Sequence, residues 1–470
     1  MNTKSTALVQ TFKKGYSKFE QIIRKFVYSD FYLLLVSLIL FLGWVTECAP
    51  FGISAMVVVT SIVLLGSDDI LPLTVNIFGA ALVIYTSEID KIIFMWPMFL
   101  LLIPCLIIFI VKNCRHKFRL GKMFYPQLAV SLALLLGGAG AISAADYARA
   151  LPTALILGFG VLAIYLLYNH FLKRDSGVDI PKYFSKTMMY IGIVISLELI
   201  VVIIRANLPF SEWHTEYWDV GWGNRNNIST YLILTAGLTM YLSTKERFGW
   251  IYFALSLFQY FCIIMSFSRG GIIFGAVSGA IAFVLTLVKS GNKKRALIST
   301  GIILAIALIL YLIFMDKINA MIVSLMERGM GTSGRTDLYQ EAWDCFKAFP
   351  FFGAGLGYSG PNFEINVMST YWFHSTFFQV IGCMGIVGFA AYVYYYVIRA
   401  KLLFKDIKNT FNLFIMAIWI GFEGYSMIDT GTFVPYPNMM FIIISTLLLE
   451  LNIPCNKQDY YNLPYAAERK

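Results

Sequence analysis

The chain has 470 residues, of which 58% are hydrophobic and only 14% are charged. A soluble globular domain carries about 25% charged residues, so the composition excludes an ordinary soluble protein. The net charge of +10 lies in the segments between apolar runs, and it therefore gives no reason to expect a nucleic-acid partner. The apolar runs are roughly 18–20 residues long, which is enough to cross the hydrocarbon core of a bilayer. We predict an all-α, polytopic integral membrane protein.

Residues 1–30 place apolar side chains at near-helical spacing, with lysine and arginine between them. This pattern predicts an amphipathic helix on the anionic cytoplasmic leaflet. Residues 31–452 form a single transmembrane domain of about 14 (12–14) helices. The predicted spans lie at roughly 31–48, 51–66, 70–86, 92–112, 126–146, 149–170, 187–205, 228–243, 248–267, 270–288, 296–315, 375–398, 411–427 and 436–452.

Lysine and arginine concentrate in every second segment between these spans. The positive-inside rule therefore predicts that both ends of the chain are cytoplasmic, with residues 453–470 as a tail. One segment on the opposite side is long, residues 316–373. A long segment in a protein with otherwise short loops is a candidate for function.

Polar residues first gather in "WGNRNNIST", residues 222–230, on the predicted outer side. One interpretation is a polar turn that leads into the next span, with Asn227 or Ser229 as the helix cap. The alternative is that Arg225 faces an anionic ligand.

The next polar site is "MSFSRGGIIFGA", residues 265–276, within about forty apolar residues. Arg269 falls at the outer end of the ninth predicted span, where it either extends to the membrane surface or binds a ligand. An outer arginine runs against the positive-inside bias, which favours the second interpretation. The glycines after it allow a tight turn. Gly271, Gly275 and Gly279 have the small-xxx-small spacing of a closely packed helix.

The long outer segment contains "GRTDLY" at residues 334–339. Asp337 suits the positive end of a helix dipole, and Arg335 either begins that helix or faces an anionic substrate. The predicted helix carries an apolar stripe that we expect to lie on the outer membrane surface, made of Leu338, Ala342, Cys345, Phe346 and Phe349. Pro350 ends this helix, and "GAGLG" at 353–357 predicts a sharp turn.

His374 lies where the long segment re-enters the membrane. A lone histidine is often structural, but it can also take up a proton near neutral pH. The predicted topology places Arg225, Arg269, Arg335 and His374 on the same side. Several guanidinium groups suit a diphosphate, and a nearby imidazole suits a general base.

The order of these motifs resembles the O-antigen ligase and polymerase superfamily, which includes capsule-type polymerases. The resemblance covers about residues 220–400: an Asn/Arg segment, "SRGG", "GR..LY..A", "FPFFGAGLG" and a histidine before "GCMGIVGF". It implies a glycosyltransferase of the bacterial cytoplasmic (inner) membrane whose active site faces outward. It also implies an undecaprenyl-diphosphate-linked saccharide donor, a glycan acceptor, and neither a cofactor nor a metal. Chain-length regulators and flippases are the implied protein partners.

Matched to the family motifs, Arg225 and Arg269 would bind the diphosphate and His374 would be catalytic, with Arg335 as a loop arginine. The sequence departs from the family at Ser375, where many members have asparagine. Acidic residues within spans are costly unless they are used. We therefore name the acidic residues within the predicted spans as supporting candidates that orient His374 or line the acceptor groove. They are Glu198, Glu423 and Asp429, and Asp337 of the long segment is a further supporting candidate.

The residues leave the acceptor open. A polymerase would extend another lipid-linked glycan, whereas a ligase would transfer the glycan to a lipid or protein. A composition rich in Ile, Phe, Tyr and Lys hints at a Gram-positive source without a lipid A core, which favours a polymerase. A flippase or transporter is a more distant alternative, because transporters often contain internal repeats and none is visible in this sequence.

Overall fold

The computed structural model confirms the all-helical class in the part of the chain that it describes. It describes residues 3–86, 96–114, 120–139, 147–174, 177–209, 212–213, 218–291, 293–316, 335–356, 373–429 and 436–451, with a few isolated positions between them. Within these residues the strands are β1 (Asp219–Val220) and β2 (Gly223–Asn224). They pair antiparallel, with Asp219 opposite Asn224. The predicted tail 453–470 lies outside the described residues.

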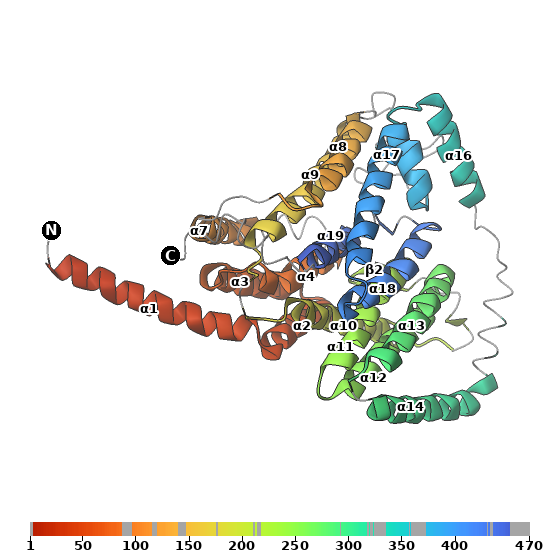
Figure 1. Cartoon of the computed structure of the whole chain (residues 1–470), viewed down its shortest axis with the longest axis horizontal. Helices are drawn as coiled ribbons and strands as arrows, with labels where there is room; N and C mark the ends of the chain where they lie inside the picture. The colour runs from red at the N-terminus through yellow and green to blue at the C-terminus, as the bar shows by residue number, and fades with distance from the viewer. Residues whose placement is uncertain are drawn as a thin grey trace.

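Each predicted span coincides with one or more helices (Figure 1). In the first half these are α2 (Asp30–Val45), α3 (Ala49–Gly66), η1 (Leu71–Leu73), α4 (Thr74–Thr86), α6 (Trp96–Leu100), α7 (Leu102–Asn113), α8 (Phe124–Ala139) and α9 (Tyr147–Phe171). In the second half they are α10 (Ile180–Ala206), α11 (Arg225–Lys245), α12 (Gly249–Met265), α13 (Arg269–Lys289), α14 (Lys293–Ile313), α17 (Thr376–Lys405), α18 (Thr410–Ser426) and α19 (Tyr436–Leu451).

Helix length bears on the number of spans. Among the described helices, α10, α13 and α17 are long and apolar enough to cross a membrane by themselves. The end of α1 (Thr3–Val27) and the following α2 would together count as a further span, but they are bent by 73°. Several other apolar helices are shorter, among them α3, α12 and α19, so the count of about 14 spans stays a prediction. The bend fits an N-terminal helix that lies across the direction of the first span, and α1 extends away from the other helices (Figure 1).

The central element of the fold is α11. Every residue from Ile228 to Leu242 is buried, because α10, α12, α13 and α18 pack around it. Small residues allow this close approach. A Cβ atom on Gly237 would lie 2.3 Å from Ile418 of α18, and one on Gly421 of α18 would lie 2.6 Å from Ser278 of α13. The helix that begins at Arg225 is therefore a rigid support.

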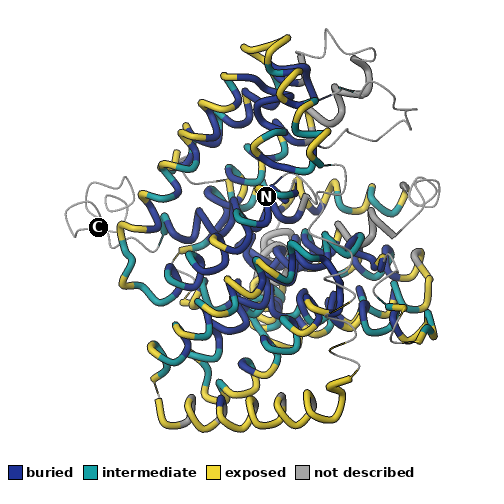
Figure 2. Tube along the Cα trace, turned by 90° about the vertical axis from the view of Figure 1, so that its right-hand side faces the viewer, coloured by how far each residue is buried: buried dark blue, intermediate teal, exposed yellow. Residues whose placement is uncertain are grey.

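The outer surface of the helical assembly is apolar, as a lipid-facing surface requires. Leucine and isoleucine on α2, α7 and α14 are widely exposed. In Figure 2, α14 is the almost wholly exposed helix along the lower edge. Its Leu304 and Leu308 are each 58% exposed. Such an apolar surface would be unfavourable in water, so the exposure supports a membrane protein.

The helix α17 is broken at Gly385, whose φ of 61° is not helical. The segment after α16 (Arg335–Ala348) bonds to the backbone groups that the break leaves open. Gly382 and Cys383 accept from the N–H groups of Ala354 and Gly355, at 2.7 and 3.1 Å. Beyond the break, the N–H groups of Ile386 and Val387 donate to the carbonyls of Pro350 and Phe351, at 2.8 and 3.2 Å. A non-helical backbone inside a membrane protein requires such partners.

The predicted helix of the long segment is confirmed as α16, and Pro350 follows its end. The expectation that its apolar stripe lies on the membrane surface is wrong for the middle of the stripe. Ala342 and Cys345 are buried, and α16 packs on the first part of α17. A Cβ on Gly382 of α17 would lie 3.2 Å from that of Ala342. Because glycine at 382 lets the helices approach, the middle of the stripe is covered by α17, whereas Phe349 at its end is 42% exposed. Residues 359–372 of the long segment lie outside the described part.

Candidate functional site

The start of α11 positions Arg225 as the first residue of the helix. The side chain of Asn224 caps the helix, accepting from the N–H groups of Asn226 and Asn227 at 3.0 and 3.3 Å. The predicted cap at Asn227 or Ser229 is therefore wrong. The β1–β2 hairpin leads directly into this cap, and Glu198 of α10 accepts a hydrogen bond from the N–H of Gly221 in the hairpin, at 3.1 Å.

The start of α13 positions Arg269 in the same way. Phe267, with a φ of 55°, makes the turn between α12 and α13. Ser268 then caps α13 by accepting from the N–H of Gly271 at 3.3 Å. The glycines after Arg269 serve packing rather than the turn. A Cβ on Gly270 would lie 2.6 Å from Ile428, and one on Gly271 would lie 2.3 Å from Ser229.

A hydrogen bond joins these two helix starts. The hydroxyl of Ser268 donates to the side-chain oxygen of Asn226 at 3.0 Å. Arg225 directly precedes Asn226 and Arg269 directly follows Ser268, so the structure brings the two arginines to neighbouring helix N-termini. Both arginines are half-buried. Backbone N–H groups and helix dipoles favour negative charge at such positions.

Asp429, just beyond the C-terminus of α18, connects the other candidate residues. Its carboxylate lies 3.3 Å from Nδ1 of His374 and 3.6 Å from the guanidinium of Arg335. It also accepts from the side-chain amide of Asn226 at 3.2 Å and from the hydroxyl of Tyr425 at 3.3 Å. The Asp429 side chain is only 12% exposed. One carboxylate thus ties together the start of α11, the start of α16 and the residues before α17.

His374 is held in an unusual backbone conformation. Its φ is 49°, in the left-handed region that non-glycine residues rarely adopt. Its carbonyl accepts a hydrogen bond from the hydroxyl of Tyr339 at 3.1 Å. The ring of Tyr339 stacks on that of Phe378, with centroids 4.4 Å apart. Strained conformations of this kind persist where surrounding contacts fix them, and they cluster at functional sites.

The imidazole of His374 has one nitrogen directed at the protein, and the ring is otherwise partly exposed. Nδ1 faces Asp429, and the side chain is 42% exposed. If Nδ1 carries the proton toward the carboxylate, Nε2 is left with a free lone pair. This is the arrangement by which a carboxylate orients an imidazole for proton abstraction.

The remaining acidic candidates lie elsewhere. Glu423 is engaged by the guanidinium of Arg399 at 2.8 Å and by the hydroxyl of Tyr396 at 2.9 Å, both on α17. Glu198 is fully buried and contacts the hairpin. Asp337 is exposed in the first turn of α16, where its charge suits the helix dipole. Among Glu198, Glu423 and Asp429, the described contacts place Asp429 next to His374.

Sequence reasoning missed Tyr339, Tyr425 and Arg399. Tyr339 belongs to the "LY" of the quoted motif and lies one helical turn after Arg335, which is a signal that could have found it. Tyr425 lies one turn before Asp429, so helical spacing from that acid could have found it too. Arg399 falls in a predicted cytoplasmic loop. It is instead 2% exposed within α17 and lies 4.1 Å above the ring of Trp419, and no local signal distinguishes it from loop arginines.

The described part of the chain holds no group of three or more His, Cys, Asp or Glu side chains placed to bind a metal ion. The site is instead cationic, with an imidazole and a carboxylate at its centre. Its residues come from the starts of α11, α13 and α16 and from the residues just before α17. Such a site can bind an anion and move a proton.

The fold and the site together define an all-helical membrane protein with a cationic site built on helix N-termini. Residues 251–393 match the family model Wzy_C, O-antigen ligase, which confirms the resemblance to the O-antigen ligase and polymerase superfamily. The matched segment contains Arg269, Arg335 and His374, whereas Arg225 and Asp429 lie outside it. No curated protein matches the chain. The family match supports a glycosyltransferase-like enzyme of the O-antigen ligase or polymerase type.

Proposed function

We propose that the protein is a membrane glycosyltransferase that polymerises undecaprenyl-diphosphate-linked oligosaccharide units on the outer face of the bacterial cytoplasmic membrane. The observation that carries this proposal is the meeting of His374 and Arg335 at Asp429, beside the helix starts that carry Arg225 and Arg269. Transfer of a sugar from a diphosphate donor requires a proton acceptor for the attacking hydroxyl and cations that stabilise the leaving diphosphate.

The chemical step follows from these positions. Nε2 of His374 takes the proton from an acceptor sugar hydroxyl, while Asp429 holds Nδ1 and balances the resulting positive charge. The hydroxyl oxygen attacks the anomeric carbon of the donor, and the bond from that carbon to the diphosphate oxygen breaks with inversion. The diphosphate leaves with the electron pair of that bond.

Arg225 and Arg269 stabilise the charge that develops on the leaving diphosphate. Arginine suits this role because it stays protonated and can form paired hydrogen bonds to phosphate oxygens. Charge stabilisation by groups already in place is often the largest contribution to catalysis. The mechanism requires no metal ion, because the guanidinium groups and helix N-termini carry the compensating charge.

The acceptor distinguishes a polymerase from a ligase. We propose a polymerase because the composition favours a source without a lipid A core, with a ligase that transfers the glycan to a lipid or protein as the second candidate. Both would use the same His374 and arginine site. A chain-length regulator and a flippase are the proposed protein partners of a polymerase.

The proposal is tested with purified protein in lipid vesicles, supplied with a lipid-linked oligosaccharide. The variants His374→Ala and Arg269→Ala should each lower the transfer rate at least about 100-fold, in line with the loss of a general base or an oxyanion partner. Asp344→Asn is the matched control, because that exposed side chain pairs with Lys347 and Gln340 of its own helix, α16. Transfer at the wild-type rate by both alanine variants would disprove the proposed function.

A further inference from the structure

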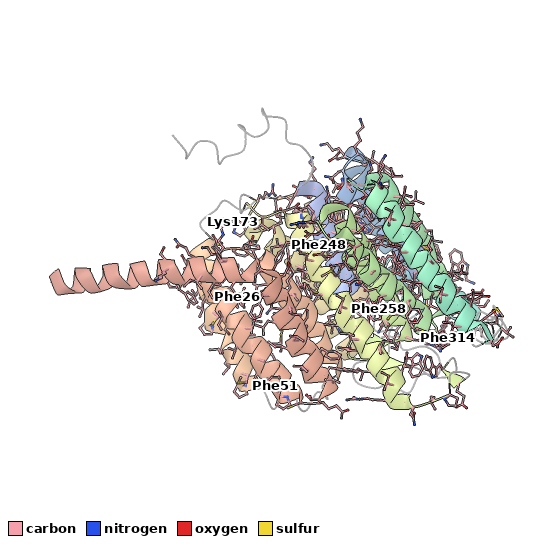
Figure 3. All side chains as sticks on the ribbon, turned by 90° about the horizontal axis from the view of Figure 1, so that it is seen from below. Phe26, Phe51, Lys173, Phe248, Phe258 and Phe314 are labelled. Atoms are coloured by element: carbon pink, nitrogen blue, oxygen red, sulfur yellow. The ribbon has the colours of Figure 1, made fainter. Side chains whose placement is uncertain are left out.

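An apolar cavity of about 360 Å³ lies between α12, α13 and α14. These three helices lie side by side at the lower right of Figure 1 and again in Figure 3, where Phe258 marks α12 and Phe314 lies just beyond α14. Residues on all three helices line the cavity, among them Leu257, Ile264, Ile272, Ala276, Gly279 and Leu304. We call this cavity the α13 groove.

The middle of the wall that α13 contributes is made by small residues, between Ile272 and Phe283. A Cβ on Gly275 would lie 3.2 Å from Ile263, and one on Gly279 would lie 3.1 Å from the ring of Tyr260. These contacts hold α13 tightly against α12 at the bottom of the groove. Ala276, which lies between the two glycines, faces the open space. The groove is thus an apolar channel along α13 that has small residues in the middle of one wall and larger apolar side chains of α12 opposite them.

The groove begins next to the cationic site. Ile272 lines it, and Ile272 follows Arg269 by less than one turn of α13. Because a helix rises about 1.5 Å per residue, the groove starts roughly 5 Å along the axis from Arg269. From there the lining residues continue along α13 as far as Phe283. A ligand with its anionic group at Arg269 would therefore meet an apolar channel where its next atoms must lie.

We propose that the α13 groove binds the hydrocarbon chain of the lipid-linked donor, nearest to its diphosphate. This inference rests on the proposed function, because it takes the diphosphate to lie at Arg269. The chain gains little hydrophobic free energy on leaving the bilayer for the groove, since both are apolar. Its gain is in position: a chain held in the groove fixes the diphosphate, and with it the anomeric carbon, relative to His374.

The helix α14 closes the outer side of the groove. Thr300 and Leu304 of α14 line the cavity, while the other face of this helix is widely exposed. A chain can thus enter laterally from the bilayer between α13 and α14. The competing occupant is an acyl chain of an ordinary phospholipid, which has the same apolar chemistry but no diphosphate to hold at Arg269.

The test uses a matched pair of variants on one helix. Ala276 lines the groove, whereas its neighbour Val277 is also exposed but does not line it. Ala276→Trp fills the groove, and Val277→Trp adds the same ring beside it. In vesicles we expect Ala276→Trp to lower kcat for the lipid-linked donor about tenfold with little change in KM, because the groove positions the donor rather than adding binding free energy. Val277→Trp should match the wild type.

A second measurement identifies the occupant. Benzoylphenylalanine replaces either Phe283, an aromatic residue that lines the groove, or Val284, which is exposed outside it. The vesicles receive a radiolabelled lipid-linked saccharide. Crosslinking to this donor at position 283 but not at 284, with competition by unlabelled donor, supports the assignment. Crosslinking at 283 only to phospholipid overturns it.

The outcomes separate this inference from the function on which it rests. If the wild type transfers the saccharide and both tryptophan variants match it, the groove assignment alone is wrong. If the wild type transfers no lipid-linked saccharide, the proposed function fails, and the groove assignment fails with it.

Discussion

Nδ1 of His374 lies 3.3 Å from Oδ1 of Asp429, although 55 residues separate them in the chain. His374 lies just before the start of α17, and Asp429 lies just after the end of α18. A backbone bond reinforces the contact, since the N–H of Thr376 donates to the carbonyl of Asp429 at 3.2 Å. The pair is therefore fixed by main chain as well as by side chains.

The pair predicts a specific pattern of rate losses. Asp429→Asn should lower kcat about 100-fold while leaving the KM for the donor nearly unchanged, because the carboxylate orients the imidazole and does not hold the diphosphate. The double variant with His374→Ala should be no slower than His374→Ala alone. Steady-state kinetics in vesicles measure both effects. Additive losses would show that Asp429 acts independently of His374.

Gly353 should be essential to the contact between the segment after α16 and the break in α17. Its φ is 70°, and a Cβ there would lie 2.3 Å from the carbonyl carbon of Cys383. We expect Gly353→Ala to destabilise the protein by more than about 3 kcal/mol, since it combines backbone strain with a main-chain clash.

Gly177 provides the control for Gly353. It has a similar φ of 73°, but a Cβ at this position would meet no atom within 4 Å. Gly177→Ala should therefore lower the free energy of unfolding only by the cost of backbone strain, about 1–2 kcal/mol. Unfolding in detergent measures both variants. Equal losses would mean that strain alone matters at Gly353 and that the contact with α17 does not.

Glu423 should prove structural rather than catalytic. It pairs with Arg399, which is almost fully buried among Tyr395, Tyr396 and Trp419. Arg399→Met leaves the carboxylate without its cation and should cost about 3–5 kcal/mol of stability, whereas the double variant Arg399→Met/Glu423→Leu should recover most of it. The double variant should retain its rate per folded molecule. A stable double variant without activity would restore Glu423 as a catalytic candidate.

Glu246, in the turn between α11 and α12, should stabilise the protein in a pH-dependent way. Burial raises the pKa of its carboxyl, but hydrogen bonds from Lys182 and Lys186 outweigh burial and hold the pKa below its usual value. A depressed folded-state pKa means that the stabilisation is complete above the unfolded-state value of about 4.3 and is lost as the pH falls through the folded-state value.

The variant Glu246→Gln tests this linkage. It should be less stable than the wild type by about 1 kcal/mol at neutral pH, the size expected for a partly exposed ion pair. The difference should stay constant down to about pH 5 and shrink below about pH 4. Thermal unfolding across this range measures it. A difference that persists undiminished into acid would rule out the ion pairs as its source.

Much of the helical framework could be predicted from local pattern. Apolar runs located a helix at every predicted span, and Arg335 begins a helix, as one of its two interpretations had it. Arg269 was expected at the end of the ninth span, whereas it is the first residue of α13. The errors arose where contacts between distant segments decide the outcome. The stripe on α16 has the pattern of a membrane-facing surface, and only the contact with Gly382 on α17 shows that the middle of the stripe is buried by protein. The cap of α11 was misplaced because the preceding hairpin, held by Glu198, sets where the helix starts.

The sequence by itself determined the class of the protein, because hydrophobicity and helical period are properties of short segments. It also supplied the chemical groups of the site, as arginines and a histidine at segment ends. Only the tertiary structure decided which carboxylate stands beside His374. Glu198, Glu423 and Asp429 look alike in the sequence, since each is an acid in an apolar stretch. They differ through partners more than twenty residues away: the hairpin for Glu198, Arg399 for Glu423, and His374 with Arg335 for Asp429.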